Sequence, residues 1–209
     1  MPIVNRISAY HDDMREWRRD IHKHPELAYN EHRTASKVAE LLRTFGVDEI
    51  VEGIGGTGLV GVIRNGEGRS IGLRADMDAL PITEDTGVPY TSVNEGVMHA
   101  CGHDGHTTML LGAAKYLAET KNFSGTVVLI FQPAEEGYAG ARAMMDDGLF
   151  DRFPVDEIYG VHNMPGVAQG EITVSPGPVM AAADNFLVTV KGSGGHGAMP
   201  HLAIDPVVA

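Results

Sequence analysis

The first 45 residues carry apolar side chains at the spacing of two amphipathic helices. One apolar series, with arginines between its members, predicts a helix over residues 6–22 that ends before Pro25. A second series predicts a helix over residues 31–45 that stops at Gly46, because glycine readily adopts the left-handed conformation that ends a helix. The first series consists of Ile7, Tyr10, Met14, Trp17 and Ile21.

The middle of the chain alternates between strand-like and helical segments. Short apolar runs predict strands over residues 59–63, 71–75, 127–131 and 158–161. Helical spacing between these runs predicts helices over residues 107–119 and 141–145. Strands that alternate with helices favour an α/β fold in which a mixed sheet is sandwiched by helices.

The composition changes near residues 175–178, which read Ser-Pro-Gly-Pro. Beyond this point the pattern predicts a strand over residues 186–190, a glycine-rich segment and a helix that begins at Asp205. We therefore predict one domain over residues 1–180 and the beginning of a smaller α+β domain over residues 181–209. A domain that ends as a helix begins is incomplete, so we expect the chain to be the front part of a longer protein.

The composition argues against several classes of partner. The net charge of −12 disfavours nucleic acid and anionic membrane surfaces. No apolar run approaches the ~20 residues of a membrane-spanning helix, and the hydrophobic content of 43% is ordinary for a globular protein. A single cysteine cannot form an internal disulfide, which is typical of a reducing compartment, so we expect a cytoplasmic protein.

A glycine-rich segment, Gly53-Ile-Gly55-Gly-Thr-Gly58, matches the spacing of a dinucleotide-binding fingerprint. That fingerprint must open a helix whose N-terminus meets the pyrophosphate. A strand-like run follows here instead. The segment is therefore interpreted as a turn between two strands.

Residues 99–106 combine the only cysteine with three histidines, namely His99, Cys101, His103 and His106. Glycines on both sides of His103 allow the backbone to fold around an ion, and thiolate with imidazole is a donor set that zinc and its neighbours prefer. The alternative is a buried cysteine beside loop histidines, since free cysteine often belongs to the core. The pattern favours a transition-metal site.

Acids or a histidine follow three of the predicted strands. Asp76 and Asp78 follow the second strand, Glu135 and Glu136 the third, and His162 the fourth. Ligands of open α/β sheets bind beyond the carboxyl ends of the strands, so we expect these side chains to meet at one edge together with the cysteine–histidine segment. For any one segment a solvated loop acid is an equally good interpretation, but the agreement of four segments favours a site.

The adjacent pair Glu135 and Glu136 suggests a division of labour. Neighbouring side chains on an extended segment point in different directions, so one can hold a metal while the other exchanges a proton with water. Serine chemistry has no comparable support, because Ser193 lacks a Gly-x-Ser-x-Gly turn.

Four motifs together resemble the M20 metallopeptidase family, and within it the amidohydrolase branch of hippurate hydrolases, N-acyl-amino-acid amidohydrolases and auxin-conjugate hydrolases. They are residues 73–81 (Leu-Arg-Ala-Asp-Met-Asp-Ala-Leu-Pro), 98–106 (Met-His-Ala-Cys-Gly-His-Asp-Gly-His), 132–137 (Gln-Pro-Ala-Glu-Glu-Gly) and 194–201 (Gly-Gly-His-Gly-Ala-Met-Pro-His). Residues 18–27 (Arg-Arg-Asp-Ile-His-Lys-His-Pro-Glu-Leu) are also typical of this branch.

The resemblance implies a two-metal hydrolase with a zinc-peptidase-like catalytic domain and a smaller lid domain that forms the dimer interface. By position it implies metal ligands at Cys101, His103, Glu136 and His162, a general base at Glu135, an oxyanion-binding histidine at His196, and carboxylates that orient ligand imidazoles at Asp76 and Asp78. We expect packing or supporting roles for the remaining candidates, His22, His24, His99, His106 and His201. The family also has a further ligand histidine near its C-terminus, so we expect residues 1–209 alone to be inactive.

The activity that the resemblance implies is hydrolysis of the amide bond of N-acyl amino acids of the hippurate type, through a metal-activated water. A dipeptidase, a carbamoyl-amino-acid hydrolase, or a catalytically incompetent metal-binding or dimerising fragment are the alternatives. The expected cofactors are two divalent ions, zinc or manganese first, with cobalt or nickel as alternatives. The expected partners are a small-molecule substrate and further copies in a homodimer or homotetramer through the lid domain.

Overall fold

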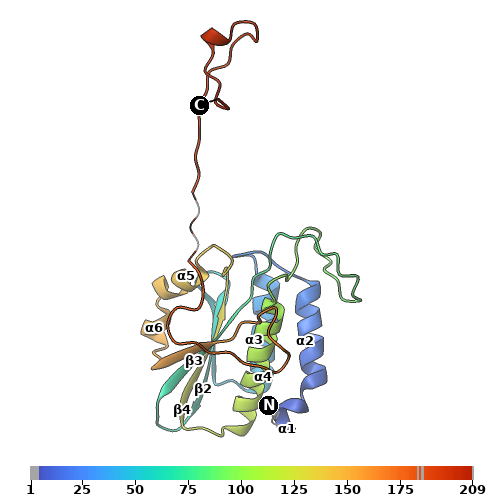
Figure 1. Ribbon diagram of the computed structural model, residues 1–209. Coiled ribbons are helices and arrows are strands. Elements are labelled where there is room, and N and C mark those ends of the chain that lie inside the picture. The colour runs from blue at the N-terminus through green and yellow to red at the C-terminus, as the bar shows by residue number, and fades with distance from the viewer. Residues whose placement is uncertain (1–4, 183, 185, 209) are drawn as a thin grey trace. The chain divides into compact units, whose positions relative to one another are not determined.

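The computed structural model describes residues 5–208 except 183 and 185. The chain divides into two compact units, Met1–Glu171 and Ile172–Ala209, and each is described by itself (Figure 1). The first unit carries the sheet and its covering helices, and the second carries one short 3₁₀ helix. Within the described residues, no helix is both long and apolar enough to cross a membrane.

The first predicted helix is two helices in the structure. They are α1 (Asn5–Ser8) and α2 (His11–Lys23). The chain breaks at Tyr10, whose ring is buried and whose hydroxyl contacts the carboxylate of Glu119. The apolar spacing did not reveal the break because Tyr10, the residue at the break, belongs to the apolar series itself. Helix α2 ends before Pro25, as predicted.

Helix α3 (His32–Phe45) confirms the second predicted helix at both ends. Its backbone terminates at Gly46, which has a φ of 75°. Near its start, the carboxylate of Glu26 accepts hydrogen bonds from the backbone N–H groups of Arg33, at 2.9 Å, and Thr34, at 2.8 Å. These bonds satisfy donors that a helix N-terminus leaves unpaired, and they fix the segment before α3.

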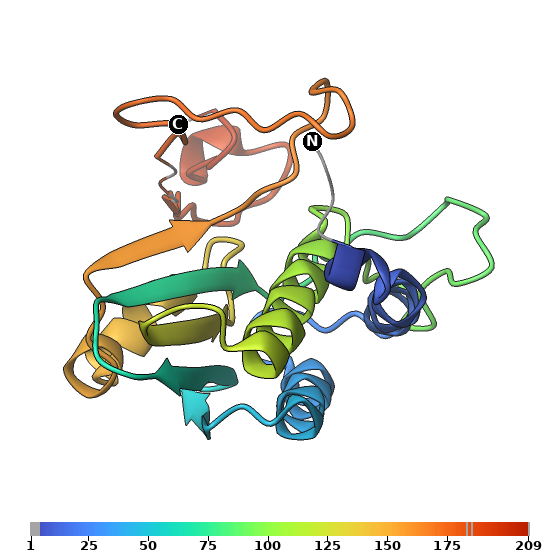
Figure 2. The same cartoon turned by 90° about the horizontal axis from the view of Figure 1, so that it is seen from below.

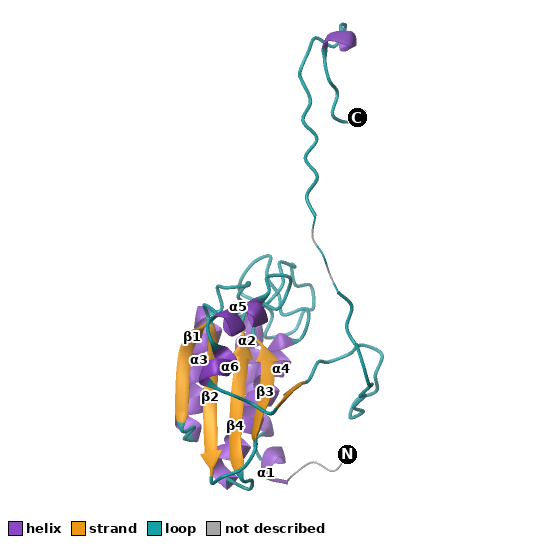
Figure 3. Cartoon of the chain, turned by 90° about the vertical axis from the view of Figure 1, so that its left-hand side faces the viewer, coloured by secondary structure: helices purple, strands orange, loops and turns teal. Residues whose placement is uncertain are grey.

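Five strands form one mixed sheet in the order β1-β2-β4-β3-β5 (Figure 3). Strand β3 is parallel to β4 and to β5, whereas β2 is antiparallel to β4 and to β1. The strands are β1 (Glu49–Ile54), β2 (Gly58–Asn65), β3 (Ser70–Asp76), β4 (Gly125–Gln132) and β5 (Glu157–Gly160). The four strands expected over the middle of the chain are all present.

Strand β1 was not among the predicted strands, because its alternation is weak: it lies at the sheet edge, and Glu52 and Gly53 are exposed. It pairs with β2 in an antiparallel ladder, and the glycine-rich segment forms the turn between them. The interpretation of that segment as a turn is therefore confirmed.

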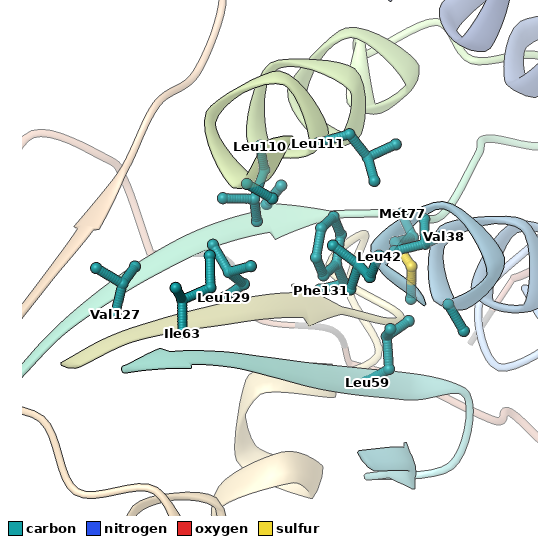
Figure 4. Packing of buried hydrophobic residues seen from close by; sticks show 13 residues of the cluster. Val38, Leu42, Leu59, Ile63, Met77, Leu110, Leu111, Val127, Leu129 and Phe131 are labelled. Atoms are coloured by element: carbon teal, nitrogen blue, oxygen red, sulfur yellow. The ribbon is translucent and has the colours of Figure 1, made fainter. Parts of the chain in front are cut away.

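Helices cover both faces of the sheet (Figure 2). On one face, α3 and α4 (His103–Thr120) contribute Leu42, Leu110 and Leu111 to a core that they share with alternate residues of β4, such as Leu129 (Figure 4). On the other face, α5 (Gly140–Asp146) and α6 (Leu149–Arg152) pack on Val128 and Ile130 of the same strand. Because β4 is central and covered twice, its residues read as a continuous apolar run.

The parallel strands end at a common edge. In the register of the sheet, Asp76 at the end of β3 faces Gln132 at the end of β4, and Arg74 faces Gly160 of β5. Helix α4 starts at this edge with His103, four residues before the start that its apolar pattern predicted. The expectation that three strand ends meet at one edge is confirmed.

The second unit differs from its predicted elements. Residues 186–190 pair with no strand among the described residues, and the side chains of Phe186 and Leu187 are about nine-tenths exposed. One isolated bridge joins Ser193 to Ile204, and the 3₁₀ helix η1 (Pro200–Leu202) lies between them. Residues 205–208 form a turn instead of the start of a helix. The predictions of a strand over 186–190 and of a helix from Asp205 are thus wrong. The strand fails because it needs a hydrogen-bonding partner, which its own apolar residues cannot supply.

Candidate metal centre and active site

Four segments deliver side chains to the carboxyl edge of the parallel strands. Two directly follow β3 and β4, one follows β5, and one is the first turn of α4 with the residues just before it. The side chains in question are Asp76, Asp78, Glu135, Glu136, His162, Cys101 and His103. All of them belong to the first unit.

His103 is fully buried and oriented by one ring nitrogen. Its Nδ1 donates to the backbone oxygen of Asp78 at 2.8 Å and lies 3.2 Å from the carboxylate Oδ1 of the same residue. Its Nε2 has no hydrogen-bond partner in the described part of the chain. The nearest carboxylate oxygens belong to Glu136, at 3.7 Å, Asp76, at 3.8 Å, and Glu135, at 4.0 Å. A buried imidazole nitrogen that faces three acids has the surroundings of a cation ligand.

Cys101 and His162 form a second contact. The Cys101 Sγ lies 3.4 Å from Nε2 of His162. Nδ1 of His162 donates to the backbone oxygen of Asn163 at 2.6 Å. The ring thus turns its unprotonated nitrogen toward the sulfur, as a ligand imidazole must.

The adjacent glutamates have different surroundings. The backbone N–H of Glu136 donates to Oδ2 of Asp78 at 3.0 Å, and Oε1 of its carboxylate is buried without a partner among the described residues. The Glu135 side chain is 39% exposed, against 25% for Glu136. One carboxylate therefore faces the buried His103, and its neighbour reaches solvent.

Asp76 reaches a histidine that was not among the expected ligands. Its Oδ1 accepts from Nδ1 of His106 at 2.7 Å, and Nε2 of His106 lies 2.6 Å from the side-chain oxygen of Asn163. Both nitrogens of His106 are thus engaged by protein groups. Burial alone would raise the pKa of Asp76, but the hydrogen bond from His106 and the charge of Arg74 lower it to about 2. Sequence reasoning did not find Asn163 as a partner of His106, although it directly follows His162.

Negative charge dominates the electrostatics of the cluster. Burial, and after it the Glu136 carboxylate, raises the pKa of the Cys101 thiol to about 12. Burial would lower the pKa of His103, but the hydrogen bond to Asp78 and the charge of Asp76 raise it above its ordinary value. An acidic pocket that disfavours a free thiolate is one in which a divalent cation is favourable, because the cation pairs with thiolate and carboxylates at once.

The donor atoms are close enough to share metal ions. Three sets of side chains each place one potential ligand atom within 4.8 Å of the others, and His103 belongs to all three. The sets are Cys101 with His103 and His162, Asp76 with His103 and His106, and His103 with Glu135 and Glu136. These donors fit divalent transition metals in their chemistry, since they combine thiolate, imidazole and carboxylate.

The weaker histidine candidates lie in other surroundings. His22 joins a buried network, with Nδ1 2.8 Å from Asp104 and Nε2 3.0 Å from Glu84. His99 is buried with neither ring nitrogen partnered in the described structure, and burial lowers its pKa to about 4, so it packs as a neutral ring. His24 contacts the backbone oxygen of Asp20, at 2.8 Å.

His196 and His201 belong to the second unit. His201 lies in η1, and His196 is exposed in the glycine-rich segment before it. Nδ1 of His196 accepts a hydrogen bond from the backbone N–H of Ala198 at 3.2 Å. The proton of the neutral ring is then on Nε2, which is free to donate.

Comparison with known proteins gives the family. Residues 72–208 match peptidase family M20/M25/M40. Hippurate hydrolase of Campylobacter jejuni is 50% identical across 100% of this chain, and thermostable carboxypeptidase 1 of Saccharolobus solfataricus is 44% identical across 99% of it. The chain covers 54% of each of these proteins, so it spans about half the length of the curated relatives it matches.

A solved structure agrees with these relatives. The YXEP protein of Bacillus subtilis, described as a dinuclear metal binding peptidase of the M20 family, is 41% identical and superposes with a TM-score of 0.71. The match covers 76% of this chain and 44% of that one. The family match includes the loops after β3 and β4, the first turn of α4 and the segment after β5, which together form the site. The chain therefore belongs to peptidase family M20/M25/M40, in the amidohydrolase branch that its motifs predicted.

Proposed function

We propose that this chain carries the metal centre of an amidohydrolase that cleaves the amide bond of N-acyl amino acids of the hippurate type. The observation that carries the proposal is the buried Nε2 of His103, which faces Glu136 without a hydrogen-bond partner among the described residues. The Cys101–His162 contact lies beside it, because His103 shares a potential ligand set with both residues. The hippurate hydrolase of C. jejuni, at 50% identity, supports this substrate class.

The donor atoms suit two divalent ions. Cys101, His103, Glu136 and His162 would hold them. When bound, the ions would polarise the substrate carbonyl and lower the pKa of water. Zinc or manganese would serve, and so would cobalt or nickel, because all accept this mixture of soft and hard donors.

The carboxylates after β3 would hold the ligands in place. Asp78 accepts from Nδ1 of His103 and from the backbone N–H of Glu136, so one carboxylate orients two ligand residues. Asp76 would act from further away, through His106 and Asn163 next to His162. Loss of such a supporting contact commonly lowers metal affinity by roughly 10–100-fold.

Glu135 would perform the proton transfers. Its carboxylate is the more exposed of the pair and lies 4.0 Å from Nε2 of His103, which supports a position beside the proposed ligands with access to water and substrate. It would take a proton from the attacking water and return it to the amide nitrogen as the C–N bond breaks. His196 would donate a hydrogen bond from Nε2 to the oxygen that becomes negative in the tetrahedral intermediate. We further propose a cytoplasmic homodimer or homotetramer that assembles through the domain to which His196 belongs.

The test is a substrate panel with the whole protein, loaded with zinc or manganese. We expect hydrolysis of benzoyl-, acetyl- and indoleacetyl-amino acids. The 44% identical carboxypeptidase of S. solfataricus favours peptide cleavage as a second candidate function. Activity toward unblocked dipeptides alone, at matched metal content, would replace the first proposal by the second.

A further inference from the structure

An apolar cavity of about 450 Å³ adjoins the candidate metal centre. This volume lies in the range of roughly 300–1,000 Å³ that small-molecule sites occupy. Its apolar walls are Leu27, Ala28, Ala79, Leu80, Pro81 and Tyr138. Glu136, a proposed metal ligand, is the one charged residue that lines it among the described residues. The cavity thus opens onto the group that would bind next to the reacting carbonyl.

The walls of the cavity are tied together by backbone contacts. Ala79 donates its N–H to the backbone oxygen of Glu26 at 2.8 Å, and a parallel bridge joins it to Leu27. Leu80 exchanges two backbone hydrogen bonds with Met98, both at 3.0 Å. These backbone hydrogen bonds fix the positions of Ala79 and Leu80, as a preformed binding pocket requires.

A further contact joins the cavity walls across the sheet edge. The Tyr29 hydroxyl donates to the backbone oxygen of Tyr138 at 2.9 Å. The segment after α2 and the loop after β4 are thereby fixed to each other. Tyr29 and Tyr138 lie within two residues after the ends of the motifs at residues 18–27 and 132–137, and the first of these motifs has no part in the proposed metal chemistry.

Backbone strain is concentrated around this cavity. Three of the four non-glycine residues with positive φ in the described structure are Tyr29 (60°), Ala134 (52°) and Ala139 (56°). Each lies within two residues of a residue that lines the cavity. Non-glycine residues in this conformation cost of order 1–3 kcal/mol each and gather at sites where the fold must hold a particular shape.

We propose that this cavity binds the acyl group of the substrate and selects apolar, aromatic acyl groups over acetyl. The inference rests on the proposed function and names the substrate feature that the same site recognises. A carbonyl held beside Glu136 would direct its apolar substituent between Leu27, Ala28 and Tyr138. Burial of a phenyl ring there would be favourable by about 25 cal/mol for each Å² of apolar surface removed from water.

The experiment narrows the cavity at Ala28. In Ala28→Leu the whole, metal-loaded protein should lose about tenfold or more in the ratio of kcat/KM for benzoylglycine to kcat/KM for acetylglycine. Tyr138→Ala removes another wall of the cavity and should also lower the benzoyl-to-acetyl ratio of kcat/KM. Because Tyr138 is 64% exposed, the melting temperature should not change. Ala141→Leu, at an exposed position of α5 outside the cavity, is the matched control. An unchanged benzoyl-to-acetyl ratio in both cavity variants would overturn the proposal.

Binding of benzoate and acetate, measured by calorimetry, separates this inference from the proposed function. We expect the wild type to bind benzoate more tightly than acetate, and Ala28→Leu to abolish the difference. Absence of all acyl-amino-acid hydrolysis, with this binding pattern intact, would reject the proposed reaction and keep the pocket. Equal binding of the two acids by the wild type would reject the pocket even if hydrolysis is observed.

Discussion

At the residue scale, His103 and His162 are each oriented by a hydrogen bond from Nδ1, the ring nitrogen that does not face the cluster. Asp78 fixes His103, and the backbone oxygen of Asn163 fixes His162. The sequence predicted that Asp76 and Asp78 support imidazoles, but it could not predict that Asp76 reaches His106. Spacing places residues at a sheet edge, whereas rotamers are selected by packing that the spacing does not contain.

The adjacent glutamates should separate metal binding from proton transfer. Glu135→Gln should keep its metal and lose about 10²–10⁴-fold in kcat, because the amide cannot accept a proton. Glu136→Gln should lose metal affinity, because the carboxylate whose oxygen lies 3.7 Å from His103 Nε2 becomes a poor ligand. Metal content measured by mass spectrometry, alongside kcat, gives both results. Loss of metal in Glu135→Gln with retention in Glu136→Gln would reverse the two assignments.

Cys101 should be required for full metal content. Cys101→Ala removes the only thiol of the chain, so we expect weaker binding of at least one ion and a loss of activity. Cys101→Asp, which restores an anionic ligand, should recover part of the metal content. Titration of the metal-free variants with zinc provides the measurement. Equal zinc stoichiometry and equal turnover in wild type and Cys101→Ala would exclude a thiolate ligand.

At the scale of secondary structure, the strands and helices that cover the sheet were predictable from apolar spacing, but the ends that carry chemistry were less so. Helix α4 begins at His103, before its predicted start. The prediction missed this first turn because the turn contains buried polar residues, which an apolar pattern cannot detect. Strand β1 was missed because it is half exposed at the sheet edge. The core of the fold is therefore encoded more plainly than the elements at the site.

Gly140 controls the loop that carries both glutamates. A Cβ at this position would lie 1.7 Å from the backbone oxygen of Pro133, so the start of α5 would have to move. Gly140→Ala should destabilise the protein by at least about 1–3 kcal/mol, as overpacked sites do. It should also reduce metal affinity, because the loop between Pro133 and Gly140 holds Glu136.

Gly105→Ala is the control for that variant. A Cβ there meets no described atom within 4 Å, and the residue lies in the first turn of α4. Alanine should leave the structure intact and raise its stability by up to roughly 0.5–1 kcal/mol, since glycine is the more flexible residue in the unfolded chain. Thermal unfolding with a zinc titration distinguishes the two. Similar melting temperatures and zinc affinities for both variants would contradict the role of Gly140.

At the scale of the whole molecule, the sequence predicted the mixed sheet and the edge where its site forms, but not the local structure of residues 172–209. The expected strand over 186–190 has no strand partner in the part of the chain that the structure describes, because strand pairing depends on partners that are remote in sequence. The hydrophobic pattern indicates which side chains need burial, but it does not identify the segment of the protein that would pack against them.

His196 should contribute to turnover but not to metal binding. Its Nδ1 accepts from Ala198, which leaves an Nε2–H to donate to developing negative charge. His196→Ala in the whole protein should lower kcat by about 10²–10³-fold, as the loss of one oxyanion donor does elsewhere. Metal content and melting temperature should equal those of the wild type. A wild-type kcat, or a loss of metal, would remove His196 from this role.

The order of the strands sets when a metal can be acquired during biosynthesis. Strand β5 follows the other four described strands in the sequence, yet it pairs with β3, so the segment that carries His162 joins the sheet only after those four have been made. Cys101 and His162 are 61 residues apart, and a chain made from its N-terminus presents the thiol long before the imidazole. Metal uptake at the proposed centre would thus follow the pairing of β5 with β3. Since bound metal stabilises only the folded form, a cell short of that metal would hold protein in which these five strands are paired but which is nevertheless degraded faster.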